Sequence, residues 1–191
     1  MNEHDWKPWL REWNRVLLAS YDPAKYSAFV DPELVTPERL ASGRLGAPGA
    51  TGEQLAALEA RLGRRLPPSY RSFLQASNGF LQPGLIVPRV LPSEEVDWYR
   101  ARHQDVIDVW TEALREPGGT EAPDTFERHL SSCLQVSEVE RIGSAVYLLN
   151  PEVVDAAGEW EAFYFAHWVP GANRYPSFRA LMEEELKRLT S

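Results

Sequence analysis

The segment of residues 51–79, TGEQLAALEARLGRRLPPSYRSFLQASNG, constrains the fold most, because it carries the start and stop signals of two consecutive helices. Thr51 and Gln54 have the spacing of a capping box, in which each side chain accepts the backbone N–H of the other residue. Gly63 is suited to end the first helix, since glycine adopts a left-handed backbone without strain. Pro68 is tolerated only in the first turn of a helix, because proline has no N–H to donate. The segment therefore predicts two short helices separated by a tight turn.

The second of these helices raises the question of catalysis, because it contains three serines: Ser69, Ser72 and Ser77. No nearby His or acidic residue is positioned to activate them, and PSYRS lacks the pattern of a nucleophile elbow. The remaining features serve folding: Asn78-Gly79 can end the helix with left-handed backbone, and one face is apolar, formed by Tyr70, Phe73 and Leu74. We interpret the segment as a structural element.

An N-terminal helix is predicted from residue 6, with Asp5 as its cap and Pro8 in its first turn. Its apolar residues recur at spacings of three and four: Trp6, Trp9, Leu10, Trp13, Val16 and Leu17. This face is expected to cover the rest of the domain. Further helices are expected from Pro37, over 93–114 with Ser93 as the cap, and over 178–189 with Ser177 as the cap.

Strands are predicted where apolar residues cluster or alternate between turn signals, at 85–90, 133–139, 144–150 and 159–168. Pro88 suggests an edge or a bulge in the first of them. The third is expected to end at Asn150-Pro151 and to form an antiparallel hairpin with the fourth. Both faces of the fourth strand carry aromatic residues, so both are expected to be partly covered.

The net charge of −8 is concentrated in residues 91–161, which contain 16 acidic residues and 5 arginines. A polyanion such as DNA would be repelled there, because nucleic-acid binding depends on neutralising phosphates with Lys and Arg. A basic protein partner would be attracted. The alternative is a solvated acidic surface that only aids solubility.

The length of 191 residues fits one domain, and a single cysteine, Cys133, excludes an internal disulfide. The first residues are acidic and their apolar run is short, which does not match a signal peptide. No apolar run reaches the roughly 20 residues that a membrane helix needs. We therefore expect a cytoplasmic protein with no membrane partner.

No catalytic or metal-binding constellation is recognisable. The histidines, at positions 4, 103, 129 and 167, do not have the spacing of metal ligands. Cys133 has His129 four residues before it, but nothing local lowers the pKa of the thiol. Glu159 and Glu161 form a carboxylate pair, as glycosidases use, yet in a strand they are more often a surface patch facing outward together. We predict no catalytic residue, metal or cofactor, and keep an undetected hydrolase as the remaining enzymatic alternative.

Residues 50–80, ATGEQLAALEARLGRRLPPSYRSFLQASNGF, closely resemble the hallmark of the SUKH superfamily, which groups fungal cell-wall regulators with many bacterial proteins. The matching positions are Leu55, Leu58, Glu59, Leu62, Gly63, Leu66, Pro67, Tyr70, Phe73, Leu74, Asn78 and Gly79. Three later segments match in the expected order: LPSEEVDWYR, SAVYLLNP and EWEAFYFAHWVPGANRYPSFRALMEEEL.

The resemblance implies an α+β fold, with a mostly antiparallel sheet flanked by helices. Residues 1–50 would form a helical N-terminal extension on a core of residues 51–191, together a single domain. It implies no catalytic residues. Many bacterial members are immunity proteins that bind and block a cognate toxin, often a nuclease, whereas fungal members are regulatory and scaffolding modules.

Two functions follow as hypotheses: an immunity protein for a basic toxin, or a regulatory interaction module without a toxin partner. For the first, the acidic residues and a nearby aromatic residue predict a partner-binding surface made of Glu94, Glu95, Asp97, Trp98, Asp105, Asp108, Glu159 and Glu161. Tyr99 is a second possible aromatic anchor.

Overall fold

The computed structural model of the chain describes residues 5–22, 35–113, 125–139, 145–166, 168 and 171–190. The described helices are α1 (Trp6–Ser20), α3 (Pro37–Ala41), α4 (Gly52–Leu62), α5 (Pro68–Ala76), α6 (Gln104–Ala113) and α7 (Phe178–Thr190), with 3-10 helices η1 (Tyr99–Ala101) and η2 (Phe126–Ser132). None of the helices in these ranges is long and apolar enough to cross a membrane.

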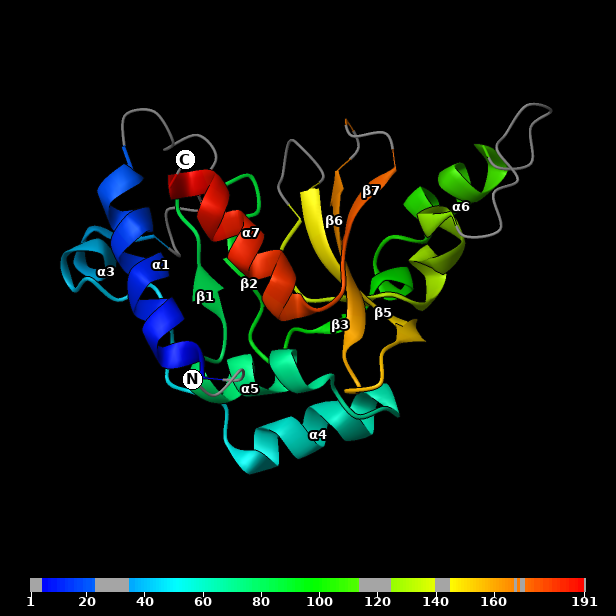
Figure 1. Cartoon of the computed structure of the whole chain (residues 1–191), viewed down its shortest axis with the longest axis horizontal. Coiled ribbons are helices and arrows are strands. Elements are labelled where there is room, and N and C mark those ends of the chain that lie inside the picture. The colour runs from blue at the N-terminus through cyan, green and yellow to red at the C-terminus, as the bar shows by residue number, and fades with distance from the viewer. Residues whose placement is uncertain are drawn as a thin grey trace.

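The strands form two antiparallel sheets. The larger sheet has the order β3-β4-β5-β6-β7, with bounds Asp97–Trp98, Leu134–Gln135, Ala145–Val154, Trp160–Ala166 and Ala172–Tyr175. The smaller pairs β1 (Phe80–Leu81) with β2 (Arg89–Val90). In Figure 1, α1 and α7 lie to the left of the larger sheet, α6 to its right, and α4 and α5 below. This arrangement confirms the predicted α+β class.

Both faces of the central hairpin β5–β6 are covered, as the alternation predicted. On one face Ala162 and Tyr164 of β6 join the core cluster that α1, α4, α5 and α7 also line. On the other face Phe163 and Phe165 join a second cluster with Ile107 of α6 and residues of η1 and η2. The sheet therefore separates two apolar layers, which explains why β6 carries aromatic residues on both of its faces.

The predicted signals of the helix pair α4–α5 are confirmed in detail. The Thr51–Gln54 capping box is formed, and Gly63 ends α4 with a φ of 67°. Pro68 begins α5. The end of α5 differs from expectation: Ser77 closes it in extended conformation, and the left-handed residue is Gly79, with a φ of 90°.

The α1 face covers the domain as predicted, and two of its three tryptophans are anchored by hydrogen bonds. Trp6 donates its Nε1–H to the Ser69 carbonyl oxygen at 2.9 Å and to the Ser72 hydroxyl at 3.0 Å. Trp13 donates to Gln82 Oε1 at 3.2 Å. Buried Trp N–H groups usually find such partners, and these contacts fix how α1 lies on α5 and on the residue that follows β1.

The prediction of one helix over 93–114 is wrong. Residues 97–98 form β3 and pair with β4, η1 follows, and α6 begins only at Gln104; residue 114 lies outside the described residues. The cause is tertiary hydrogen bonding: Arg61 donates to the Ser93 and Val96 carbonyl oxygens at 2.8 and 2.7 Å. Ser93 is no cap either, because a turn and then β3 follow it in place of a helix.

The predicted end of β5 at Asn150-Pro151 is also wrong, since the strand continues to Val154. Asn150 pairs with Glu161 and the next pair is Val154 with Trp160, so the residues between them form a bulge. Proline cannot donate to a ladder and is accommodated at bulges. Pro151 therefore distorts β5 without ending it.

Candidate functional site

The described residues bring together no catalytic arrangement. Cys133 is fully buried, and burial raises the pKa of its thiol well above the ordinary value, which disfavours a nucleophilic thiolate. The ring of His129 contacts Glu152 at 2.7 Å, between Nδ1 and Oε2. His103 stacks on Tyr99 with ring centroids 4.6 Å apart. His4 and His167 lie outside the described residues, and the described ones contain no group of three possible metal ligands.

Glu159 does not face outward as expected; only 7% of its surface is exposed. Its Oε1 accepts the Ser69 N–H at 2.8 Å, and its Oε2 accepts the Ser69 hydroxyl at 2.6 Å. A carboxylate is favoured at the positive end of a helix, and Ser69 lies in the first turn of α5. Glu159 is thus a buried cap of α5. The serine-containing segment of residues 51–79 thus does contact an acidic residue, but Glu159 is 90 residues away from Ser69 in the chain.

Glu161 is also held within the fold, because Arg174 of the neighbouring strand β7 binds both of its carboxylate oxygens. The side chain of Glu161 is 11% exposed. Its Oε2 accepts a further hydrogen bond from Asn150 at 3.2 Å. Each carboxylate of the pair is therefore held by its own structural contacts, although both side chains line one cleft of about 300 Å³.

Glu94 and Glu95 each bind other parts of the chain. The exposed Glu94 accepts hydrogen bonds from Gln54 at 2.5 Å and Asn78 at 3.2 Å. Burial raises the pKa of Glu94, but the hydrogen bonds from its own backbone N–H, from Asn78 and from Gln54 lower the pKa by more, so the net shift is downward. Asn78 also accepts the Ser93 N–H at 2.8 Å, so the Asn78-Gly79 turn holds the start of the 93–98 segment.

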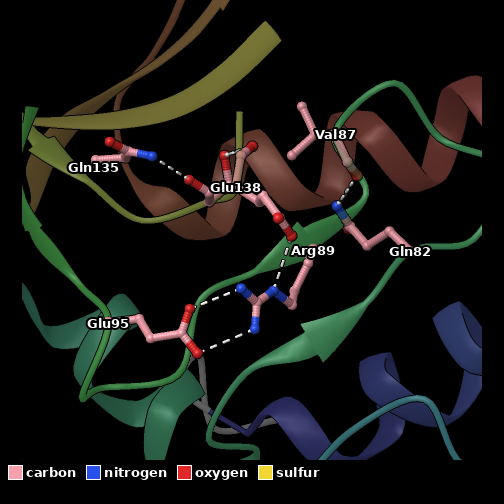
Figure 2. Close-up of polar contacts among 7 residues, drawn as sticks. Gln82, Val87, Arg89, Glu95, Gln135 and Glu138 are labelled. Atoms are coloured by element: carbon pink, nitrogen blue, oxygen red, sulfur yellow. Dashed lines mark hydrogen bonds and ion pairs between the residues drawn. The ribbon is translucent and has the colours of Figure 1, made fainter. Parts of the chain in front are cut away.

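Glu95 belongs to an arginine clamp, in which Arg89 lies between two carboxylates (Figure 2). Arg89 binds Glu95 through Nη1 and Nη2 at 3.1 and 2.7 Å, and Glu138 through Nε at 3.0 Å. Burial opposes the charged guanidinium, yet both carboxylates outweigh it and raise the pKa of Arg89. Bidentate pairs of this kind fix geometry, so the clamp joins β2 to the segments on either side of it.

The aromatic candidates are only partly accessible. Trp98 is half-buried at the border of the larger core, with the Arg100 guanidinium 5.7 Å from its ring. Tyr99 is 2% exposed and cannot serve as an anchor for a partner. Asp97 is half-buried in β3, and its Oδ1 accepts the Trp98 N–H at 2.7 Å.

The α6 helix presents the acidic residues that remain free. Asp105, Asp108, Val109 and Glu112 are all exposed, and their spacing places them on one face of the helix. Val109 is 67% exposed, the highest value among the large apolar side chains of the described chain. Within the described residues no ion pair involves these three acids, although Gln104 donates to Asp108 at 2.8 Å. We call Asp105, Asp108, Val109 and Glu112 the α6 stripe.

The structure therefore does not gather the eight predicted residues into one surface. Asp105 and Asp108 lie together on α6, Glu94 and Glu95 contact α4 and β2, and Glu159 and Glu161 lie against α5 and β7. Sequence reasoning missed Val109 and Glu112 as members of the α6 stripe. Their spacing from Asp105 was visible in the sequence, but the wrong helix boundary hid which face is exposed.

The antiparallel sheet carries helices on both faces and defines an α+β domain, as the resemblance of residues 50–80 implied. Its described residues contain no reactive centre. The sequence pattern of the SMI1 / KNR4 family (SUKH-1) matches residues 49–170. The chain belongs to this family, which confirms the resemblance. The match includes α4 to β6, whereas α1, α3, β7 and α7 lie outside it. No curated protein matches the chain.

Proposed function

We propose that this protein is an immunity protein, which binds and neutralises a cognate toxin with a basic surface in the bacterial cytoplasm and acts without catalysis. Membership of the SMI1 / KNR4 family supports a binding role. The observation that carries the proposal is the α6 stripe, where three acidic side chains surround an exposed valine. The other acidic candidates described above are largely occupied by contacts within the chain.

The proposed mechanism is occlusion assisted by charge. A nuclease toxin needs cationic residues around its phosphate site, and an acidic surface would be steered toward them. Val109 would supply the apolar centre, and the three acids would form a polar rim, as in stable interfaces. A standard interface buries about 1,600 Å² in total, so neighbouring residues such as Arg102 would be included.

The test is co-expression of the protein with the toxin encoded beside it, with growth as the readout. Wild type is expected to rescue growth, and the triple variant Asp105→Asn, Asp108→Asn, Glu112→Gln to rescue it less. The control neutralises three exposed acids elsewhere: Glu12→Gln, Glu53→Gln and Glu183→Gln. Absence of rescue by the wild-type protein with every neighbouring toxin would reject the proposal and favour a regulatory module instead.

A further inference from the structure

A polar cleft lies on the α4–α5 side of the molecule and shares no lining residue with the α6 stripe. It has a volume of about 740 Å³ and is lined by Glu59, Arg65, Leu66, Pro68, Arg71, Ser72 and Gln75. This volume is in the range of small-molecule sites. Neither the family match nor the proposed function gives the cleft a role.

Two arginines of the cleft differ from the other arginines in residues 51–90. Arg61 and Arg64 donate to backbone carbonyl oxygens, and Arg89 binds two carboxylates. Arg65 is exposed and has no partner among the described residues. Arg71 uses its Nε, 3.3 Å from Glu59 Oε1, and its two Nη groups have no described partner. The cleft thus contains unused donors with the geometry that guanidinium groups offer to oxyanions.

The floor of the cleft is fixed before any ligand arrives. Glu59 Oε1 accepts the Leu66 N–H at 3.1 Å and so holds the turn between α4 and α5. The Ser72 hydroxyl accepts from Trp6 and donates to the Ser69 carbonyl oxygen at 2.9 Å. Since the floor is already ordered, binding would cost little beyond ordering the two arginine side chains.

We propose that this cleft binds a small molecule that carries a phosphate or carboxylate group, with Arg65 and Arg71 as the binding residues. A long polyanion is disfavoured, because the protein has a net charge of −8 and would repel the rest of such a ligand. The Glu59 carboxylate lies beside Arg71 and competes with the ligand for its charge. Removing the charge of Glu59 is therefore expected to strengthen anion binding, whereas removing the charges of Arg65 and Arg71 is expected to weaken it.

The test is isothermal titration calorimetry of the full chain with inorganic pyrophosphate and, separately, with citrate, at a fixed ionic strength of about 0.15 M. Binding is expected for at least one anion, with the double variant Arg65→Gln, Arg71→Gln weakening it at least about tenfold. Glu59→Gln keeps an oxygen that can accept the Leu66 N–H, and this variant is expected to strengthen anion binding about threefold. The control is Arg128→Gln, an exposed arginine of η2 without a described partner.

Binding of pyrophosphate alone would assign a phosphate ligand, and binding of citrate alone a carboxylate ligand. The proposal is overturned if neither anion binds, if Arg128→Gln weakens binding as much as the double variant, or if Glu59→Gln weakens it. Toxin neutralisation does not enter this experiment, so its result is independent of the proposed function.

Discussion

The Glu159 carboxylate binds Ser69 twice, through the backbone N–H at 2.8 Å and through the hydroxyl at 2.6 Å. Glu159 is positioned by the tight turn of the β5–β6 hairpin, where Asp155 accepts the Glu159 N–H at 2.9 Å. The contact joins the sheet to the start of α5, which also receives Trp6 of α1. One carboxylate therefore organises the meeting point of three segments distant in sequence.

Replacing Glu159 with alanine is expected to lower the free energy of unfolding by about 2–4 kcal/mol, because two buried donors of Ser69 lose their acceptor. Glu159→Gln should cost less, since one oxygen remains. Urea denaturation measures both. As a control, Glu53→Ala removes an exposed acid of α4. A Glu159→Ala cost as small as that of this control would contradict the structural role.

Truncation of Trp6 to alanine is expected to cost about 3–5 kcal/mol of unfolding free energy, the range for large buried aromatic side chains. Trp6 is 1% exposed, and its ring packs edge-on against Phe73 at 5.3 Å between centroids. Arg11→Ala on the exposed side of the same helix should change stability by less than about 0.5 kcal/mol. If α1 only rested loosely on the domain, the two variants would unfold at similar urea concentrations.

Cys133 should not react with a thiol reagent such as Ellman's reagent in the folded protein at neutral pH. Its side chain is buried, so the reagent cannot reach the sulfur. Burial also raises the pKa of the thiol, so the reactive thiolate is disfavoured. Full reaction is expected once urea unfolds the chain, and a time course of absorbance measures both states. Rapid labelling of the native protein would reopen the nucleophile hypothesis that the sequence left for Cys133 and His129.

Glu185 makes the stability of the protein depend on pH in a direction opposite to that of most carboxylates. Burial raises the folded-state pKa of Glu185 above its ordinary value of 4.5, and this effect exceeds that of its hydrogen bonds from Tyr147 and Arg188. The folded chain therefore holds the proton more tightly than the unfolded chain does. The resulting stabilisation is fully present below pH 4.5 and is lost as the pH rises through the folded-state value.

The variant Glu185→Gln stays neutral and lacks this dependence, so its stability relative to wild type should increase as the pH rises above 4.5. Urea unfolding of both proteins over a pH series measures the difference, with the exposed Glu183→Gln as the control for surface charge. A difference that is constant with pH, or that shrinks as the pH rises, would contradict the pKa direction.

Local signals made most of the fold predictable. The capping box of α4, the proline at the start of α5 and the Asp5 cap of α1 act within a few residues of the backbone groups they satisfy, so the sequence displays both partners. The alternation of β6 likewise reflects two covered faces. These features depend on neighbours in the chain or on strand periodicity alone.

What could not be predicted depends on partners far apart in the chain. The 93–114 segment has helical spacing, but its first part pairs with β4 and is held by Arg61. The sequence around Glu159 is typical of a surface carboxylate, because its partner Ser69 is brought close only by the tertiary fold. For the same reason the free charge of residues 91–161 is smaller than the sequence indicates, because Glu95 and Glu161 are paired with arginines. The acids of the α6 stripe are among those that stay exposed.

The proposed function requires that the α6 stripe binds a basic partner, and the association rate constant tests this requirement most directly. The cognate toxin is mixed with wild type, the triple α6 variant and the Glu12, Glu53, Glu183 control by stopped flow at low salt and at about 0.15 M salt. The α6 variant is expected to associate about tenfold more slowly at low salt, and its association rate should depend less on salt, while the control resembles wild type. Equal rates and equal salt dependence for the α6 variant and wild type would contradict it.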